Sequence, residues 1–81
     1  MTKVIITYRQ CKAARDLLGW RQSDLSEKTK INKTTLADFE RGLRNLKVEN
    51  LEKVVNAFED HGIRFENDKI KYGVELLKDF E

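Results

Sequence analysis

Polar side chains that could pair with DNA bases cluster near the middle of this 81-residue chain. The segment KTTLADFER predicts a short helix with Lys33, Thr34, Thr35, Asp38 and Arg41 facing outward. A lysine can donate to guanine O6 and N7, a threonine can bond a base or touch a thymine methyl group, and an aspartate can accept from cytosine N4. These residue types together fit a DNA groove, although each one alone is also compatible with a solvated helix face.

This helix is expected to be the second of a pair. Residues 22–42, QSDLSEKTKINKTTLADFERG, predict two short helices joined by a tight turn. The apolar residues are Leu25 in the first helix, Ile31 in the turn, and Leu36 and Phe39 three apart on one face of the second. Because nearly all other positions are polar, we expect the second helix to pack shallowly and to stay exposed along most of its length, as a helix that enters a major groove must.

A helix is predicted on each side of this pair. Thr7 and Gln10 form the pattern of a capping box and Gly19 supplies a left-handed exit, which predicts a helix from about Tyr8 to Leu18.

The other flanking helix is predicted near residues 48–60, where apolar residues recur at spacings of three and four. These residues are Leu51, Val54, Val55 and Phe58. His61 lies at the end of this helix and Gly62 is its natural exit.

After Gly62 the apolar residues alternate with charged or small ones, from Ile63 to Leu76, and Asn67-Asp68 is a turn signal, so a β-hairpin is predicted. The β-branched run Val4 to Ile6 suits a short strand that could join the hairpin in a small sheet. The expected fold is therefore mainly α, a single compact four-helix domain. We divide it into a strand-like segment at 1–6, a helical bundle at 7–61, and a hairpin with a tail at 62–81.

The pattern resembles the phage repressor and Cro class of helix-turn-helix regulators, the XRE-like family. The matching positions run from the Gln that opens the first motif helix to the Glu-x-Gly that closes the second: Gln22, Leu25, Ser26, Ile31, Asn32, Leu36, Phe39, Glu40 and Gly42. The segment 10–20, QCKAARDLLGW, is similar to the first helix of the family and its Leu-Gly-aromatic exit. The resemblance covers roughly residues 10–58 and implies a lambda-repressor-like helix-turn-helix domain.

The resemblance implies roles for individual residues. Lys33, Thr34 and Asp38 fall where base edges are read, and Arg15 and Glu40 fall where the family places an ion pair that fixes the tilt of the recognition helix. Gln22 and Asn32 fall where family members grip the DNA backbone. From their position in or beside the motif, the further residues expected to contact phosphates are Arg21, Thr35, Arg41, Arg44 and Lys47.

Two residues depart from the family pattern. Lys30 stands where a turn glycine is usual, and a left-handed conformation there would cost about 1 kcal/mol, so we expect a turn of slightly different shape. Arg21 stands where Ser or Thr usually caps the first motif helix. Its side chain cannot accept the N–H bonds of the first turn, but it adds a cation beside an expected phosphate.

Charge is divided unevenly along the chain. Residues 1–47 hold eleven Lys and Arg against five Asp and Glu, a net +6, whereas residues 48–81 hold five against nine, a net −4, which together give +2. The basic half carries the predicted motif. A positive surface of this kind steers encounter with DNA and supplies much of its non-specific affinity.

Other classes of function find little support in the sequence. The chain has no Ser-His-Asp set and no Gly-rich phosphate loop, and its carboxylates are dispersed, so we do not expect an enzyme. Cys11 and His61 are the single Cys and His, too few for a disulfide or a metal site, and no cofactor is expected. We expect Cys11 and Trp20 in the core. No apolar run approaches the ~18 residues of a membrane span and no signal peptide is recognised, so a soluble, cytoplasmic protein is expected.

Two hypotheses of different classes follow. The first is a sequence-specific transcriptional regulator, a repressor that binds a palindromic operator in double-stranded DNA as a homodimer, with the contact between copies formed after Gly62, where Leu76, Leu77 and Phe80 have no predicted place. The alternative is a protein-interaction module, such as an antitoxin-type partner of another protein, which adds the alternating segment 63–76 to a partner's sheet. The basic, polar front of the helix that begins at Lys33 favours DNA.

Overall fold

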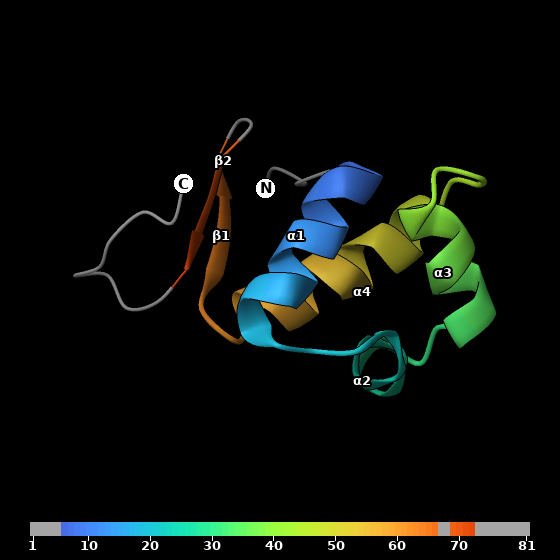
Figure 1. The fold of residues 1–81 in the computed structure, drawn as a ribbon, viewed down its shortest axis with the longest axis horizontal. Coiled ribbons are helices and arrows are strands. Elements are labelled where there is room, and N and C mark those ends of the chain that lie inside the picture. Colours follow the sequence, from blue (N-terminus) through green and yellow to red (C-terminus); the bar gives the residue numbers. More distant parts are fainter. Residues whose placement is uncertain (1–5, 67–68, 73–81) are drawn as a thin grey trace.

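The computed structural model describes residues 6–66 and 69–72, which form four helices followed by a hairpin. The elements in chain order are α1 (Tyr8–Leu18), α2 (Gln22–Thr29), α3 (Lys33–Glu40), α4 (Val48–Glu59), β1 (Ile63–Glu66) and β2 (Lys69–Tyr72). Figure 1 places α3 at one end of the molecule and the hairpin at the other, with α1 and α4 between them and α2 along one side. The mainly α fold predicted from the sequence is confirmed, with helix boundaries within one residue of those predicted.

Helix α1 begins and ends at the predicted signals. The Thr7 hydroxyl accepts from the Gln10 amide N–H at 3.1 Å, and the Gln10 side-chain oxygen accepts from the Thr7 amide N–H at 2.9 Å. These two bonds complete a capping box and satisfy N–H groups that have no partner within the helix. Gly19 follows at φ 72°, where the left-handed backbone turns the chain toward α2.

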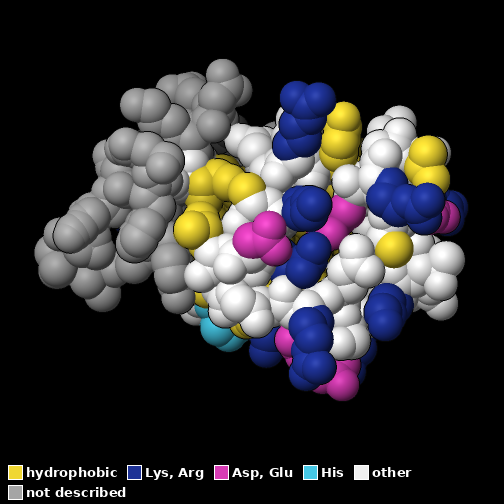
Figure 2. Space-filling model, in the orientation of Figure 1, with side chains coloured by type: hydrophobic (Ala, Val, Ile, Leu, Met, Phe, Trp, Pro, Cys, Tyr) yellow, Lys and Arg dark blue, Asp and Glu magenta, His cyan; other side chains and the backbone are white. Residues whose placement is uncertain are grey.

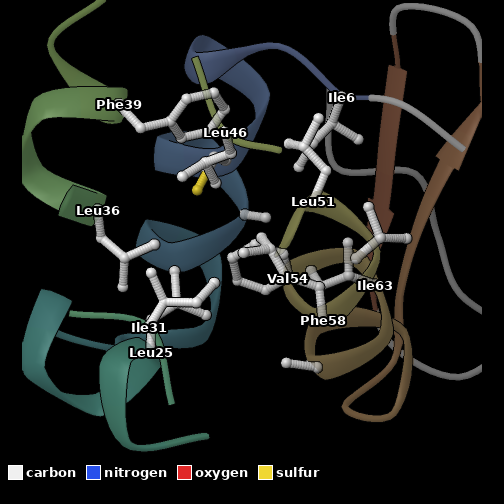
Figure 3. Packing of buried hydrophobic residues seen from close by; sticks show 14 residues of the cluster. Ile6, Leu25, Ile31, Leu36, Phe39, Leu46, Leu51, Val54, Phe58 and Ile63 are labelled. Atoms are coloured by element: carbon white, nitrogen blue, oxygen red, sulfur yellow. The ribbon is translucent and has the colours of Figure 1, made fainter. Parts of the chain in front are cut away.

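The core lies between the four helices and extends to the first strand (Figure 3). Its buried hydrophobic residues are Ile6, Cys11, Ala14, Leu25, Ile31, Leu36, Phe39, Leu46, Leu51, Val54, Val55, Ala57, Phe58 and Ile63. The apolar residues predicted to face inward from the motif helices and from α4 are all in this set. The buried position predicted for Cys11 is confirmed.

Trp20 packs at the edge of the core and is only partly buried, which corrects the prediction of a core residue in part. Its ring stacks on Phe58 with centroids 5.6 Å apart, and the His61 ring meets it edge-on at 4.9 Å. The His61 Nδ1 atom also lies 2.9 Å from the Ala57 carbonyl oxygen, in the last turn of α4. Trp20 therefore links the α1–α2 connection to the end of α4.

The hairpin pairs β1 and β2 in antiparallel register, with Ile63 opposite Tyr72 and Phe65 opposite Ile70. Ile63 is buried, and the Phe65 ring meets Phe58 edge-on at 6.0 Å, so β1 is held against α4. Within the described residues the sheet has two strands.

Ile6 is the described member of the predicted N-terminal strand, and it belongs to no strand. Its side chain is instead buried in the core, so apolar packing rather than sheet pairing accounts for this β-branched residue. Residues 1–5 lie outside the described part of the chain, as do residues 73–81, which include the predicted dimer contacts Leu76, Leu77 and Phe80.

Candidate nucleic-acid interface

Helix α3 is a short helix with well-defined ends. The Asn32 side-chain oxygen accepts from the Thr34 amide N–H at 2.7 Å, which caps the first turn as predicted. At the other end Gly42 adopts φ 77°, and the Leu43 amide N–H donates back to the Asp38 carbonyl at 2.9 Å. Both ends are thus fixed by local bonds, so the direction of the helix depends on what it packs against.

One side of α3 is buried and the opposite side is open. Leu36, Phe39 and Glu40 are buried. At 100° per residue, the side opposite them is centred on Thr34, Asp38 and the helix-ending Arg41.

The outward positions differ in exposure. Lys33, Thr34 and Arg41 are exposed, whereas Asp38 and Thr35 are partly buried. The helix is therefore less uniformly exposed than predicted, and Thr35 lies on the flank of the outward side. Ala37 lies at the opposite edge of this outward side, next to the buried Glu40, and the sequence analysis does not name it. Its spacing of three from Thr34 and four from Arg41 was the available signal.

The turn between α2 and α3 is held by side-chain hydroxyls. Ser26 donates to the Ile31 carbonyl at 2.6 Å, and the buried Thr29 hydroxyl donates to the Leu25 carbonyl at 2.8 Å and accepts from the Ile31 N–H at 3.3 Å. These bonds satisfy backbone groups that the chain reversal removes from the helical ladder.

Lys30 adopts φ 63°, ψ 25° in this turn. The expectation of a different turn shape was wrong, since the lysine takes the left-handed conformation that a glycine would adopt. Its amide N–H donates to the Ser26 carbonyl at 2.7 Å, and this bond helps to hold the conformation against its cost.

Arg21 begins α2 without a side-chain cap, as predicted. The Asp24 carboxylate instead accepts from the Arg21 amide N–H at 2.8 Å. The Arg21 side chain is 85% exposed, and its Nε lies 3.8 Å from the Asp24 carboxylate, so the guanidinium forms a surface ion pair that a phosphate can still approach.

Glu40, at the last position of α3, is the centre of a buried polar cluster. Arg15 of α1 donates to both carboxylate oxygens, from Nε to Oε2 and from Nη2 to Oε1, each at 2.9 Å. Gln22 of α2 donates to Oε1 at 3.2 Å, and the Cys11 thiol of α1 lies 3.5 Å from Oε2. Arg15 also donates to the Trp20 carbonyl at 2.8 Å. The side chain of Arg15 is 12% exposed and that of Glu40 is 3% exposed.

The cluster sets the charge states of its members. Burial alone would raise the pKa of Glu40, but the hydrogen bonds from Arg15 and Gln22 and the arginine charge lower it below its usual value. The same pair raises the pKa of Arg15, chiefly through the bond to Glu40. Burial, followed by the negative charge of Glu40, raises the pKa of the Cys11 thiol. The cluster is therefore a fixed ion pair beside an un-ionised thiol, and it joins α1, α2 and α3.

The side-chain amide of Gln22 thus makes a hydrogen bond inside the protein, in addition to any bond that it makes to a ligand. An amide nitrogen has two N–H groups, and one of them is directed to Glu40. The sequence predicts only a phosphate contact for Gln22 and does not indicate its position beside Glu40.

Exposed cations come before and after the α2–α3 pair in the sequence. The exposed residues Arg41, Arg44 and Lys47 follow it, and Arg21 precedes α2. Figure 2 shows Lys and Arg side chains distributed over the part of the molecule formed by α1, α2 and α3, on the face shown there. Such a surface favours a polyanionic ligand.

The described residues hold no group of three or more His, Cys, Asp or Glu placed to bind a metal ion. Among the same residues, no helix has the length and apolar character needed to cross a membrane.

A family model described as helix-turn-helix matches residues 12–59. The match runs from α1 to the end of α4, more than half of the chain, and it includes the whole Glu40 cluster except Cys11. Among proteins with curated descriptions, none matches this chain.

Proposed function

Because the chain belongs to the XRE-type helix-turn-helix family of DNA-binding regulators, we propose that it reads a specific DNA sequence with the outward side of α3 and represses transcription there, in the cytoplasm. The observation that carries this proposal is the construction of α3. The helix has an open polar side, capped ends, and a buried carboxylate that ties it to both preceding helices. A reading helix needs this rigidity, because base-edge hydrogen bonds tolerate little misplacement.

Base reading falls to the front of α3. Lys33 is exposed and can donate to guanine O6 and N7, and Thr34, also exposed, can bond a base. Asp38 lies one turn further along the same side, where its carboxylate can accept from cytosine N4.

Phosphate contacts hold the helix in register. Arg21, which precedes α2, and Arg41, Arg44 and Lys47, which follow α3 in the chain, are exposed cations, and Thr35 can add a hydroxyl from the flank of α3.

Two amides would grip the backbone at the helix starts. Asn32 uses its oxygen for the cap, so its amide N–H groups are the donors for a phosphate. Gln22 would use the N–H that Glu40 does not take.

A single α3 spans only eight residues and can read few base pairs. We therefore propose that two copies bind a palindromic operator, with their recognition helices about 34 Å apart, one turn of the duplex. Residues after Gly62 form the proposed contact between copies. A truncation after Gly62 that stayed folded and fully dimeric in sedimentation would contradict that assignment.

The test begins with selection of bound sequences from a random duplex pool, followed by affinity measurements at several salt concentrations. Lys33→Ala should weaken binding to the selected site by about 1–3 kcal/mol and relax discrimination at one base pair. Arg44→Ala should weaken selected and random duplexes alike and lower the salt slope by roughly one unit. Lys53→Ala removes an exposed cation from α4 and is the matched control.

Recovery of no preferred sequence would overturn the proposal. Binding that is insensitive to salt would also contradict it and would favour a protein-interaction module.

A further inference from the structure

Ala37 lies on the outward side of α3, between residues that the proposed function assigns to DNA. In α3, all of whose residues are described, the other apolar side chains are Leu36 and Phe39, and both are buried. Ala37 is only partly exposed, yet it is neither in the core cluster nor among the partly buried hydrophobic residues that pack against it. The exposed part of Ala37 therefore lies outside the apolar core, where a ligand could cover it.

The neighbours of Ala37 define what could cover it. Lys33 and Thr34 lie four and three residues before it and Arg41 lies four residues after it, so these side chains surround it on the helix surface. All three are exposed and polar. A ligand that hydrogen-bonds to these three polar side chains must itself be largely polar. It can cover Ala37 with an apolar group only if its polar surface includes such a group.

In the major groove that apolar group is the C5-methyl of thymine, which no other DNA base carries. We propose that Ala37 is a specificity-determining residue that packs its methyl group on a thymine methyl of the bound site. This inference rests on the proposed function and deepens it, because it assigns one base pair of the operator to a non-polar contact. The small side chain also lets the helix approach the base closely, so a longer residue would separate Lys33 and Thr34 from their partners.

Replacement of individual thymines by deoxyuracil tests this directly, since it removes only the methyl group. The probe is a duplex of the selected sequence in which each thymine in turn is replaced by deoxyuracil. For the wild-type protein, one replacement should weaken binding about fourfold, the effect expected from burying one methyl group.

The protein variants assign that effect to a residue. In Ala37→Gly the same replacement should have no effect, whereas Ala13→Gly should retain the fourfold loss. Ala13 is an exposed alanine of α1, so this control carries the same chemical change and a similar loss of helix propensity. For each variant, the affinity for the deoxyuracil duplex is compared with its own affinity for the thymine duplex. Differences in folding between variants therefore cancel. Thr34→Ser removes the other methyl group on this side of α3 and should also retain the loss.

The possible results distinguish a wrong assignment of the Ala37 contact from a failure of the proposed DNA-binding function. A fourfold loss that persists in Ala37→Gly, or that disappears in Thr34→Ser, would overturn the assignment to Ala37. A selected site whose thymines can all be replaced without effect would overturn it too, and both results leave sequence-specific binding intact. Failure to select any site would overturn the proposed function, and this inference with it.

Discussion

Replacing Glu40 by Gln should make the protein much easier to unfold, because this carboxylate of α3 accepts hydrogen bonds from both α1 and α2. Glutamine has nearly the same shape but keeps one oxygen, and its NH2 group must face a donor of Arg15 or Gln22. Arg15 would then be an almost buried cation whose remaining counter-charge is the exposed carboxylate of Asp16, 3.9 Å from its Nη1. Removing one partner of a buried ion pair costs about 3–5 kcal/mol, and we expect about 3 kcal/mol because glutamine retains part of the hydrogen bonding.

That loss is large for a chain of this size. At roughly 0.05–0.15 kcal/mol per residue, 81 residues give a free energy of unfolding of about 4–12 kcal/mol. The melting temperature should fall by about 12–24 °C, since 1 kcal/mol corresponds to about 4–8 °C in a domain of this length.

Denaturant unfolding at pH 7, followed by circular dichroism, measures the effect. Glu27→Gln is the matched control, because Glu27 is exposed on α2 and its replacement should change stability by no more than about 0.5 kcal/mol. Arg15→Met combined with Glu40→Gln should cost about 2 kcal/mol less than the sum of the single variants. A loss below about 1 kcal/mol for Glu40→Gln, with additive single effects, would refute the argument that the cluster holds the helices together.

Three further predictions concern backbone strain and charge. Lys30→Gly should raise the free energy of unfolding by up to ~1 kcal/mol, because φ 63° suits glycine, and an unchanged or lower value in denaturant titration would contradict this. Gly42→Ala should lower it by about 1–2 kcal/mol, since φ is +77° and an added Cβ would lie 3.3 Å from the Tyr8 ring; a neutral effect would count against the strain. Because Arg15 and Gln22 hold the pKa of folded Glu40 below the usual value of a glutamate, its contribution to stability should be complete above the unfolded-state pKa and be lost as the pH falls through the folded-state pKa. Glu40→Gln should lose part of that decline in unfolding titrations between pH 7 and pH 3, and an identical decline in both proteins would show that other carboxylates cause it.

The elements of this fold could be predicted because their signals are local. The capping box at Thr7, the glycines that end helices, and the apolar spacing in α4 each involve residues within one or two turns. The hairpin from Ile63 to Tyr72 is predicted in the same way, from alternation and a local turn signal.

The buried contacts of the candidate site are harder to predict from the sequence, because they join residues far apart in the chain. The family resemblance implied the Arg15–Glu40 pair, but the contribution of Gln22 depends on how α2 crosses the end of α3. Lys30 shows a second difficulty. Intrinsic preference argues against a left-handed lysine, yet the packing of α2 against α3 overrides a cost of about 1 kcal/mol. Ala37 was overlooked because a small apolar residue gives no chemical signal until the buried side of its helix is known.

Amide chemical-shift mapping can show directly whether α3 is the surface that reads DNA. An isotope-labelled sample is titrated with the selected duplex and with a scrambled duplex of the same composition. We expect both duplexes to shift amides near Arg21 and Arg44, and only the selected duplex to produce large, saturating shifts from Lys33 to Asp38. Shifts confined to the hairpin from Ile63 to Tyr72, with α3 unchanged on addition of the selected duplex, would contradict this expectation.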